Sequence, residues 1–201
     1  MSDVLDIPAT DAAMRLLGAT LHGRGVSVRL TEVEAYAGQD DPGSHAFRGR
    51  TPRTEVMFGP AGRLYVYFSY GMHVCANYVC GVDGTAAAVL LRAGTVVDGI
   101  ELARRRRPGR SDRDLARGPA RLTSALGIGL DDYDLDLHDP ASPVRLELGE
   151  PLTKRAISSG PRVGVSGAGG GPEYPWRFWI DGEPSVSPYR PAKPRRRAVE
   201  R

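Results

Sequence analysis

The sequence predicts a single mixed α/β (α+β) domain organised around a central β-hairpin. A chain of 201 residues suits one domain and can bury a full core. Runs 64–70 and 73–79 are dense in aromatic and β-branched residues and are separated only by Gly71 and Met72, which indicates two strands joined by a tight turn. Further short strand-like runs alternate with three helix-like segments, so neither an all-α nor an all-β fold is favoured.

The two predicted strands of the hairpin carry large aromatic or polar side chains on both faces. A period of two places Tyr65, Tyr67 and Ser69 on one face, and the return strand presents His73, Cys75 and Asn77 together. One interpretation is an aromatic sheet core with an exposed Tyr70 at the tip. The other is a wedge, formed by Tyr70 and Met72, beside a stacking pocket for a nucleobase. The pattern alone leaves both open.

The run 26–36, VSVRLTEVEAY, reads as a strand. Ideal alternation places Glu32, Glu34 and Tyr36 on the same face as the apolar residues Val26, Val28 and Leu30. Burial raises the pKa of a carboxyl group, as a general base near neutral pH requires; the alternative is a glutamate paired with a buried arginine. Alternation does not rank the two glutamates. Arg92, which ends the apolar run 86–93, is an obvious partner.

The other expected elements follow from local signals. Helices are expected at 12–21 (capped by Thr10 and Asp11), 98–107 and 118–126, and strands at 86–93, 143–149, 162–166 and 177–180. Residues 37–62 form a long loop that holds His45 and the basic side chains of Arg48, Arg50 and Arg53. The glycine-rich segment 167–171 predicts a flexible loop, and 191–201 a disordered basic tail beyond a domain spanning 1–190.

Composition narrows the function class only mildly. The net charge is +3 and the pI about 9.0, which is compatible with nucleic acid without demanding it. Only Lys154 and Lys193 among the 27 basic residues are lysines, a bias that a GC-rich genome explains. Without a long apolar run or a secretory pattern, we expect a cytoplasmic protein with no membrane partner. Cys75 and Cys80 are expected to be small core residues, with no disulfide and no metal site.

Four stretches in this order and spacing resemble the alkyladenine (3-methyladenine) DNA glycosylase family. They are TEVEAY (31–36), SHAFRGRTPR followed by MF (44–58), LYVYFSYGMHVCAN (64–77) and LLRA (90–93). GPARL, RVGVS and PWRFWI add weaker matches, so the resemblance extends to about Val186. It implies an enzyme that flips a damaged purine out of double-stranded DNA and hydrolyses its N-glycosidic bond. It also implies a curved, mainly antiparallel sheet with peripheral helices and a protruding hairpin.

The resemblance also implies roles for individual residues. Glu34 would be the general base and Arg92 its partner in holding the attacking water, with the main-chain carbonyl of Val163 completing the water site. Tyr36, His45 and Tyr67 would sandwich the flipped base. Asn77 would crowd the 2-amino group of guanine. Contacts to the opened duplex would come from Tyr70, Met72 and His73. His73 departs from the tyrosine expected at its place, and the glycine-rich 167–175 segment departs from a more ordered linker.

We therefore expect a monomeric base-excision DNA glycosylase that uses water and needs no cofactor or metal. No lysine lies between Met1 and Lys154, whereas a glycosylase that also cuts the backbone generally needs an amine nucleophile, so we expect no lyase activity. The α-amino group and the two late lysines are the only exceptions to that argument. The alternatives are a non-catalytic damaged-DNA-binding module and a small-molecule hydrolase such as a nucleoside hydrolase.

Overall fold

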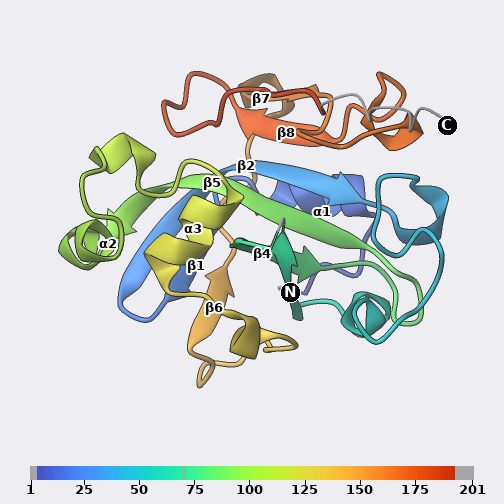
Figure 1. The fold of residues 1–201 in the computed structure, drawn as a ribbon, viewed down its shortest axis with the longest axis horizontal. Helices are drawn as coiled ribbons and strands as arrows, with labels where there is room; N and C mark the ends of the chain where they lie inside the picture. Colours follow the sequence, from blue (N-terminus) through green and yellow to red (C-terminus); the bar gives the residue numbers. More distant parts are fainter. Residues whose placement is uncertain (1–3, 70, 193–201) are drawn as a thin grey trace, which may run out of the picture.

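An eight-stranded antiparallel sheet forms the centre of the molecule in a computed structural model that describes residues 4–69 and 71–192 (Figure 1). The strand order is β3-β4-β5-β2-β1-β6, and β8 pairs with both β2 and β7. The strands are β1 (Thr20–Gly23), β2 (Val26–Tyr36), β3 (Leu64–Ser69), β4 (His73–Val79), β5 (Ala88–Asp98), β6 (Val144–Glu147), β7 (Ile157–Gly160) and β8 (Arg177–Ile180). The predicted α+β class is confirmed.

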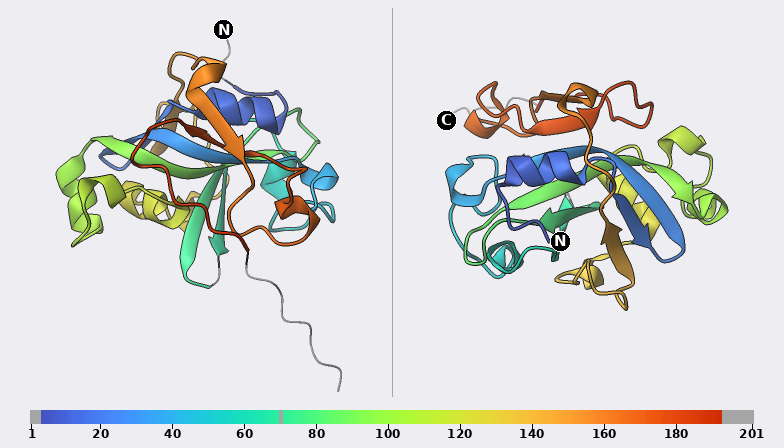
Figure 2. Two further views of the ribbon diagram at one scale, coloured as in Figure 1. Left: turned by 90° about the horizontal axis from the view of Figure 1, so that it is seen from above. Right: turned by 180° about the vertical axis from the view of Figure 1, so that it is seen from behind.

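Three helices lie around this sheet: α1 (Ala9–Leu16), α2 (Ile100–Arg106) and α3 (Pro119–Leu126). Figure 1 shows α3 in front of the sheet and α1 behind it, and the view from behind in Figure 2 agrees. Figure 2 also shows the β3–β4 hairpin protruding from the body, as predicted. None of the helices in the described ranges has the length and apolarity that crossing a bilayer requires.

The predicted helix at 12–21 is wrong at both ends. α1 begins after Pro8 and ends at Leu16, and the strand β1 that follows was not predicted. Gly18 adopts a positive φ of 83°, a conformation that ends a right-handed helix. The chain then turns back onto β2, where the Gly18 N–H donates to the carbonyl of Leu30 and the Leu30 N–H donates to Ala19.

Other boundaries were partly right. The helix expected at 118–126 is confirmed from Pro119, and the strands at 26–36 and 177–180 are confirmed. β5 runs on to Asp98, so the helix expected at 98–107 begins only at Ile100. The strand expected at 162–166 does not form. On the side away from β2, β8 pairs instead with β7. The glycine-rich segment contains a short 3-10 helix, Ala168–Gly170, in which Gly169 is buried.

A β-bulge in β2 overturns the predicted face of the two glutamates. The pairing of β2 with β5 shifts register on both sides of Glu32, at Leu30/Glu32 and at Glu32/Val33. After this bulge Val33 joins the hydrophobic cluster that also holds Leu30, whereas Glu34 lines a cavity. Glu32 and Glu34 are therefore buried as expected, but not on the apolar face of Leu30, because the extra residue re-aims the strand.

Candidate active site

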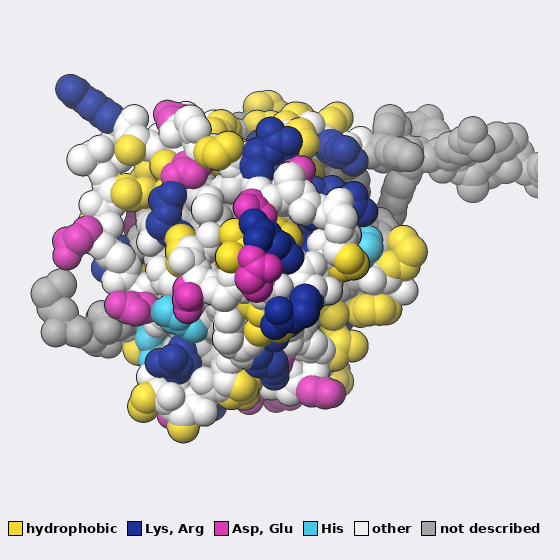
Figure 3. Space-filling view, turned by 90° about the vertical axis from the view of Figure 1, so that its left-hand side faces the viewer, with side chains coloured by type: hydrophobic (Ala, Val, Ile, Leu, Met, Phe, Trp, Pro, Cys, Tyr) yellow, Lys and Arg dark blue, Asp and Glu magenta, His cyan; other side chains and the backbone are white. Residues whose placement is uncertain are grey.

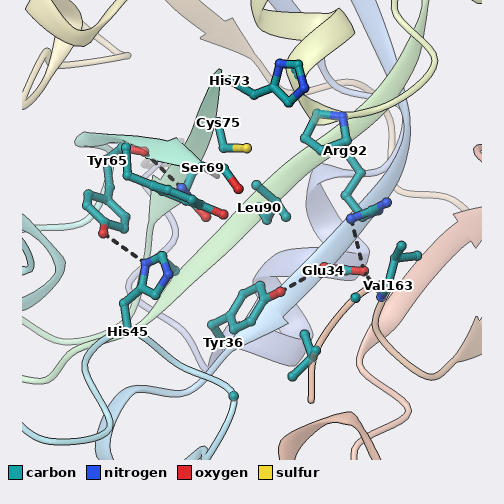
Figure 4. Close-up of a pocket in the computed structure, with 18 of the residues that line it drawn as sticks. Glu34, Tyr36, His45, Tyr65, Ser69, His73, Cys75, Leu90, Arg92 and Val163 are labelled. Atoms are coloured by element: carbon teal, nitrogen blue, oxygen red, sulfur yellow. Dashed lines mark hydrogen bonds and ion pairs between the residues drawn. The ribbon is translucent and has the colours of Figure 1, made fainter. Parts of the chain in front are cut away.

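A cavity of about 740 Å³ opens between the C-terminal half of β2, the inner face of the hairpin, the start of α3 and the segment 163–166 (Figure 4). The two sets predicted from alternation are confirmed and share one face of the hairpin, since Tyr65, Tyr67, Ser69, His73, Cys75 and Asn77 all line this cavity. So do the other sequence-predicted residues Glu34, Tyr36, His45, Arg92 and Val163. Segments far apart in the chain therefore converge on one hollow.

Glu34 lies at the floor of the cavity with no exposed surface. Its Oε1 accepts a hydrogen bond of 2.7 Å from the Val163 backbone N–H and lies 3.3 Å from Nη1 of Arg92. Its Oε2 accepts a hydrogen bond of 2.8 Å from the Tyr36 hydroxyl, as drawn in Figure 4. The contact of Val163 is made by its N–H, and the role expected for its carbonyl stays a prediction. The carboxylate is thus oriented by three donors at the edge of a cavity.

Arg92 joins Glu34 to the second buried carboxylate, Glu32. Nε of Arg92 donates to Glu32 Oε1 at 2.7 Å, and Arg177 donates to the same oxygen at 2.8 Å. Ser187 contributes its backbone N–H and its hydroxyl at 2.6 and 2.9 Å. Burial disfavours the charged form of Glu32, but Arg92 and Arg177 outweigh it and lower the pKa of this carboxyl. Burial likewise opposes the charge of Arg92, yet Glu34 and Glu32 raise its pKa above the ordinary value, so the guanidinium stays charged.

Three aromatic groups form the walls of the cavity. His45 meets Tyr67 edge to face, with ring centroids 4.6 Å apart, and Tyr36 stands across the cavity in Figure 4. Burial, followed by the charge of Glu34, raises the pKa of Tyr36; burial, followed by Cys75, raises the pKa of Tyr67. Both phenols therefore stay neutral and offer flat, uncharged faces on which a planar ring can stack.

The hydrogen bonds of His45 define the tautomer of its neutral ring. Desolvation, followed by the charge of Arg53, lowers the pKa of His45 to about 4. Nε2 lies 3.4 Å from an Arg53 nitrogen, which can only donate, and Nδ1 lies 3.0 Å from the Tyr65 hydroxyl. The arrangement assigns the proton to Nδ1, and the imidazole next to the cavity carries no charge at neutral pH.

Asn77 and Cys75 complete the hairpin wall. The Asn77 side-chain amide donates to the Tyr65 carbonyl at 3.0 Å, which fixes its orientation toward the cavity. Cys75 and Cys80 are both free and buried, in agreement with the expected lack of a disulfide. Burial raises the pKa of the Cys80 thiol to about 12 and also raises that of Cys75, so both thiols are protonated at neutral pH.

The tip of the hairpin is open to solvent. Met72 is 70% exposed and His73 is exposed beside it. A side chain of this size and apolarity at a protruding tip is available to meet a large partner. Tyr70, the predicted wedge, lies outside the described residues.

The arginines of the two predicted charge runs differ in their partners and in whether they reach the cavity. On the α2 side of the molecule, basic and acidic side chains are interspersed (Figure 3), and Arg104 pairs with both Glu101 and Asp112. Arg106 donates to the carbonyls of Ala125 and Arg24. Both therefore have structural partners. Arg53, from the predicted basic loop, instead lines the cavity with its guanidinium carbon 5.3 Å from the Tyr67 ring centre.

Sequence reasoning missed a buried pair behind the cavity, Arg162 and Asp41. Two hydrogen bonds of 2.6 and 2.7 Å join them, and neither side chain is exposed. The run RVGVS predicted a strand. In the structure this segment forms no strand: the Arg162 side chain is buried, and the backbone N–H of Val163 donates to Glu34. An arginine at the start of a short strand-like run is a weak signal, and its partner lies 121 residues away in the sequence. No group of three or more potential metal ligands from His, Cys, Asp and Glu occurs in the described part of the chain.

Comparison of the sequence with known proteins identifies the family of this chain. A profile of the methylpurine-DNA glycosylase family matches residues 3–184. A relative from Nocardia farcinica, named "Putative 3-methyladenine DNA glycosylase", is 59% identical over 193 residues, covering 93% of this chain and 89% of its own. Relatives with the same name from Leifsonia xyli and Mycobacterium tuberculosis are 56% and 55% identical, covering 90% and 94% of this chain and 87% and 93% of theirs. The chain that builds this cavity belongs to the methylpurine-DNA glycosylase family.

Proposed function

We propose that the protein is a monofunctional DNA glycosylase that flips a damaged purine out of double-stranded DNA and hydrolyses its N-glycosidic bond. The observation that carries this proposal is the position of Glu34 and Arg92 at the floor of a cavity with aromatic walls. Family membership and the names of the relatives support the same activity.

In the proposed complex the flipped base stacks between Tyr36 on one side and His45 and Tyr67 on the other. Stacking on an aromatic side chain is worth roughly 1–3 kcal/mol per base. A positively charged alkylated purine gains cation–π attraction from the two neutral tyrosines. Asn77, held by its bond to the Tyr65 carbonyl, would stand against the position of a guanine 2-amino group. Met72 and His73 would contact the opened duplex, together with Tyr70.

In the proposed reaction Glu34 takes a proton from a water molecule as that water attacks the sugar carbon. The bond between this carbon and the base nitrogen breaks, and its electron pair leaves with the base. A cationic base leaves as a neutral molecule. The negative charge of Glu34 also stabilises the oxocarbenium-like sugar, and Arg92, whose Nη1 lies 3.3 Å from Oε1, is the positive partner of this buried carboxylate.

The proposal includes no strand cleavage because, among the described residues, no lysine lines the cavity. Lys154 does not line it, and Lys193 lies outside the described residues. A lyase generally forms a Schiff base between an amine and the sugar. Within residues 4–69 and 71–192, no lysine is therefore placed for that chemistry.

Single-turnover incubation with duplexes that carry one hypoxanthine, one ethenoadenine or one 7-methylguanine tests the proposal. Strand breaks that appear only after hot alkali are the expected result. Breaks without alkali would reveal a lyase and contradict the monofunctional mechanism. Salt-sensitive duplex binding without breaks on any lesion would point to a non-catalytic DNA-binding module. Cleavage of free nucleosides that is insensitive to salt would point to a small-molecule hydrolase.

A further inference from the structure

Arg162 occupies a position that the proposed reaction does not use. It is 1% exposed and does not line the cavity, yet all its polar nitrogens have acceptors. Asp41 binds it through both carboxylate oxygens, and the carbonyls of Ala35 and Gly169 accept its other bonds. A Cβ on Gly43 would lie 2.4 Å from Nη2 of Arg162, so only glycine allows the loop to approach this closely.

The guanidinium of Arg162 covers one face of the Tyr36 ring, with its central carbon 4.5 Å from the ring centre. Tyr36 itself lines the cavity. A ring has only two faces, and Arg162 occupies one of them from a position outside the cavity. The face left for a stacked base is therefore the opposite one, and the ring lies between the base and a buried positive charge.

We propose that the Arg162–Asp41 pair sets the charge preference of the cavity, and that Asp41 neutralises Arg162 so that a cationic purine is accepted on Tyr36. This inference rests on the proposed function. Arg162 and Asp41 are specificity-determining residues in it, and neither contacts the reacting atoms. Arg162 holds the Tyr36 face and the segment leading to Val163, while Asp41 cancels the charge that this support introduces.

Coulomb's law gives the size of the effect. A base stacked about 3.5 Å beyond the Tyr36 ring lies about 8 Å from the Arg162 guanidinium. At an effective dielectric constant near 20, one uncompensated charge at that distance changes the binding of a cation by roughly tenfold to thirtyfold. A neutral base feels no such net force. Both kinds of base gain the same electron density as the bond to the sugar breaks, so the effect of the charge on departure cancels in the ratio of the two lesions. The difference in binding remains, and it lowers the preference for the cationic lesion.

The test compares single-turnover efficiency (maximal rate divided by half-saturating enzyme concentration) for 7-methylguanine, a cationic lesion, with that for hypoxanthine, a neutral one. Asp41→Asn leaves Arg162 uncompensated, and the ratio of the two efficiencies should fall roughly tenfold. Arg162→Gln leaves Asp41 uncompensated, and the ratio should rise. The double variant removes both charges, and the ratio should return to within about threefold of wild type although both rates are lower.

Asp132→Asn is a matched control. Asp132 is another buried carboxylate that binds an arginine, Arg24, through both oxygens at 2.5 and 3.0 Å, and neither residue lines the cavity. This variant should lose stability without changing the ratio. If circular dichroism shows that Arg162→Gln does not fold, the inference is still tested by comparing the ratio of efficiencies in Asp41→Asn with the ratio in Asp132→Asn.

The outcomes separate the two proposals. A ratio that stays constant in Asp41→Asn, or that moves in the same direction in Asp41→Asn and Arg162→Gln, would overturn the charge-preference inference and leave the glycosylase proposal intact. Failure of the wild-type protein to release either base would overturn the glycosylase proposal, and the inference with it.

Discussion

Glu32 and Glu34 lie two residues apart on β2, both fully buried and both in contact with Arg92, yet their surroundings differ. Glu32 is bound by two arginines and by two groups of Ser187, and it does not line the cavity. Glu34 has one arginine at 3.3 Å, one phenol and one backbone N–H, and it borders open space. In the proposed mechanism, access and unused acceptor capacity, not burial or charge alone, distinguish the reactive carboxylate from the structural one.

Replacing Glu34 by Gln gives the largest effect expected from this comparison. The amide cannot accept the proton of the attacking water, so single-turnover excision of hypoxanthine should fall by roughly 10³-fold or more. Thermal unfolding should change less than in Glu32→Gln, because fewer bonds to Glu34 are lost. Excision at the wild-type rate would remove Glu34 from the proposed mechanism.

Replacing Glu32 by Gln should lower stability more than activity, the opposite of what we expect for Glu34→Gln. Removing one partner from a buried ion network typically costs about 3–5 kcal/mol, so the melting temperature should fall by roughly 10 °C. Because the folded-state pKa of Glu32 lies below its ordinary value of 4.5, its stabilisation is fully present above pH 4.5 and is lost as the pH falls through the folded value. The stability gap between wild type and variant, measured by urea unfolding, should therefore narrow below pH 4.5. A gap that widens there would contradict this assignment.

Removing the Tyr36 hydroxyl tests how much one of the hydrogen bonds to Glu34 contributes to its reactivity. Tyr36→Phe keeps the ring but deletes the 2.8 Å hydrogen bond to Oε2. A hydrogen bond to a charged group is worth about 1.5–3 kcal/mol, so the maximal excision rate should change by roughly tenfold or more while duplex binding stays within about twofold. Tyr36→Leu is the matched variant, since it also removes the stacking face and should weaken capture of the base. Wild-type kinetics for Tyr36→Phe would show that the hydroxyl is irrelevant, and equal kinetics for the two variants would show that the stacking face adds nothing.

His45 gives the smallest expected effect. Its folded-state pKa of about 4 lies below the ordinary 6.5, so the unfolded chain takes up a proton first as the solution is acidified. The stability that His45 contributes is present above pH 6.5 and is lost between pH 6.5 and 4. Because much of His45 is still exposed to solvent although its ring is partly desolvated, the effect is reduced to about 1 kcal/mol or less. His45→Gln should flatten the pH dependence of unfolding across that window, and an unchanged slope would contradict the shifted pKa.

Local patterns predicted much of this architecture. Alternation correctly grouped Tyr65 with Tyr67 on one strand and Cys75 with Asn77 on the other, and the pairing of β3 with β4 without a bulge brings the two sets onto one face. Glycine and proline signals located α3, which begins at Pro119 and is closed by Gly127 at a φ of 74°. These features depend on neighbours in the sequence, so the sequence contains enough information to predict them.

Features that depend on distant partners were not predictable from such patterns. The bulge beside Glu32 reverses the expected side of the strand, and nothing in VSVRLTEVEAY marks it. The choice between Glu32 and Glu34 depends on which of them Arg177 and Ser187 reach. Local pattern placed Arg162 in a strand, and its carboxylate partner, Asp41, could not be found because it lies in a loop 121 residues away in the sequence.

The bonds between Glu32 and the end of the described chain also constrain when the protein can mature during synthesis. Arg177 and Ser187 follow Glu32 by 145 and 155 residues. At a translation rate of about 5–20 residues per second, Glu32 is synthesised roughly seven to thirty seconds before these partners. We expect the nascent chain to keep this carboxylate in water until then, so the site on β2 would be completed only after the segment that holds Arg177 and Ser187 has been translated.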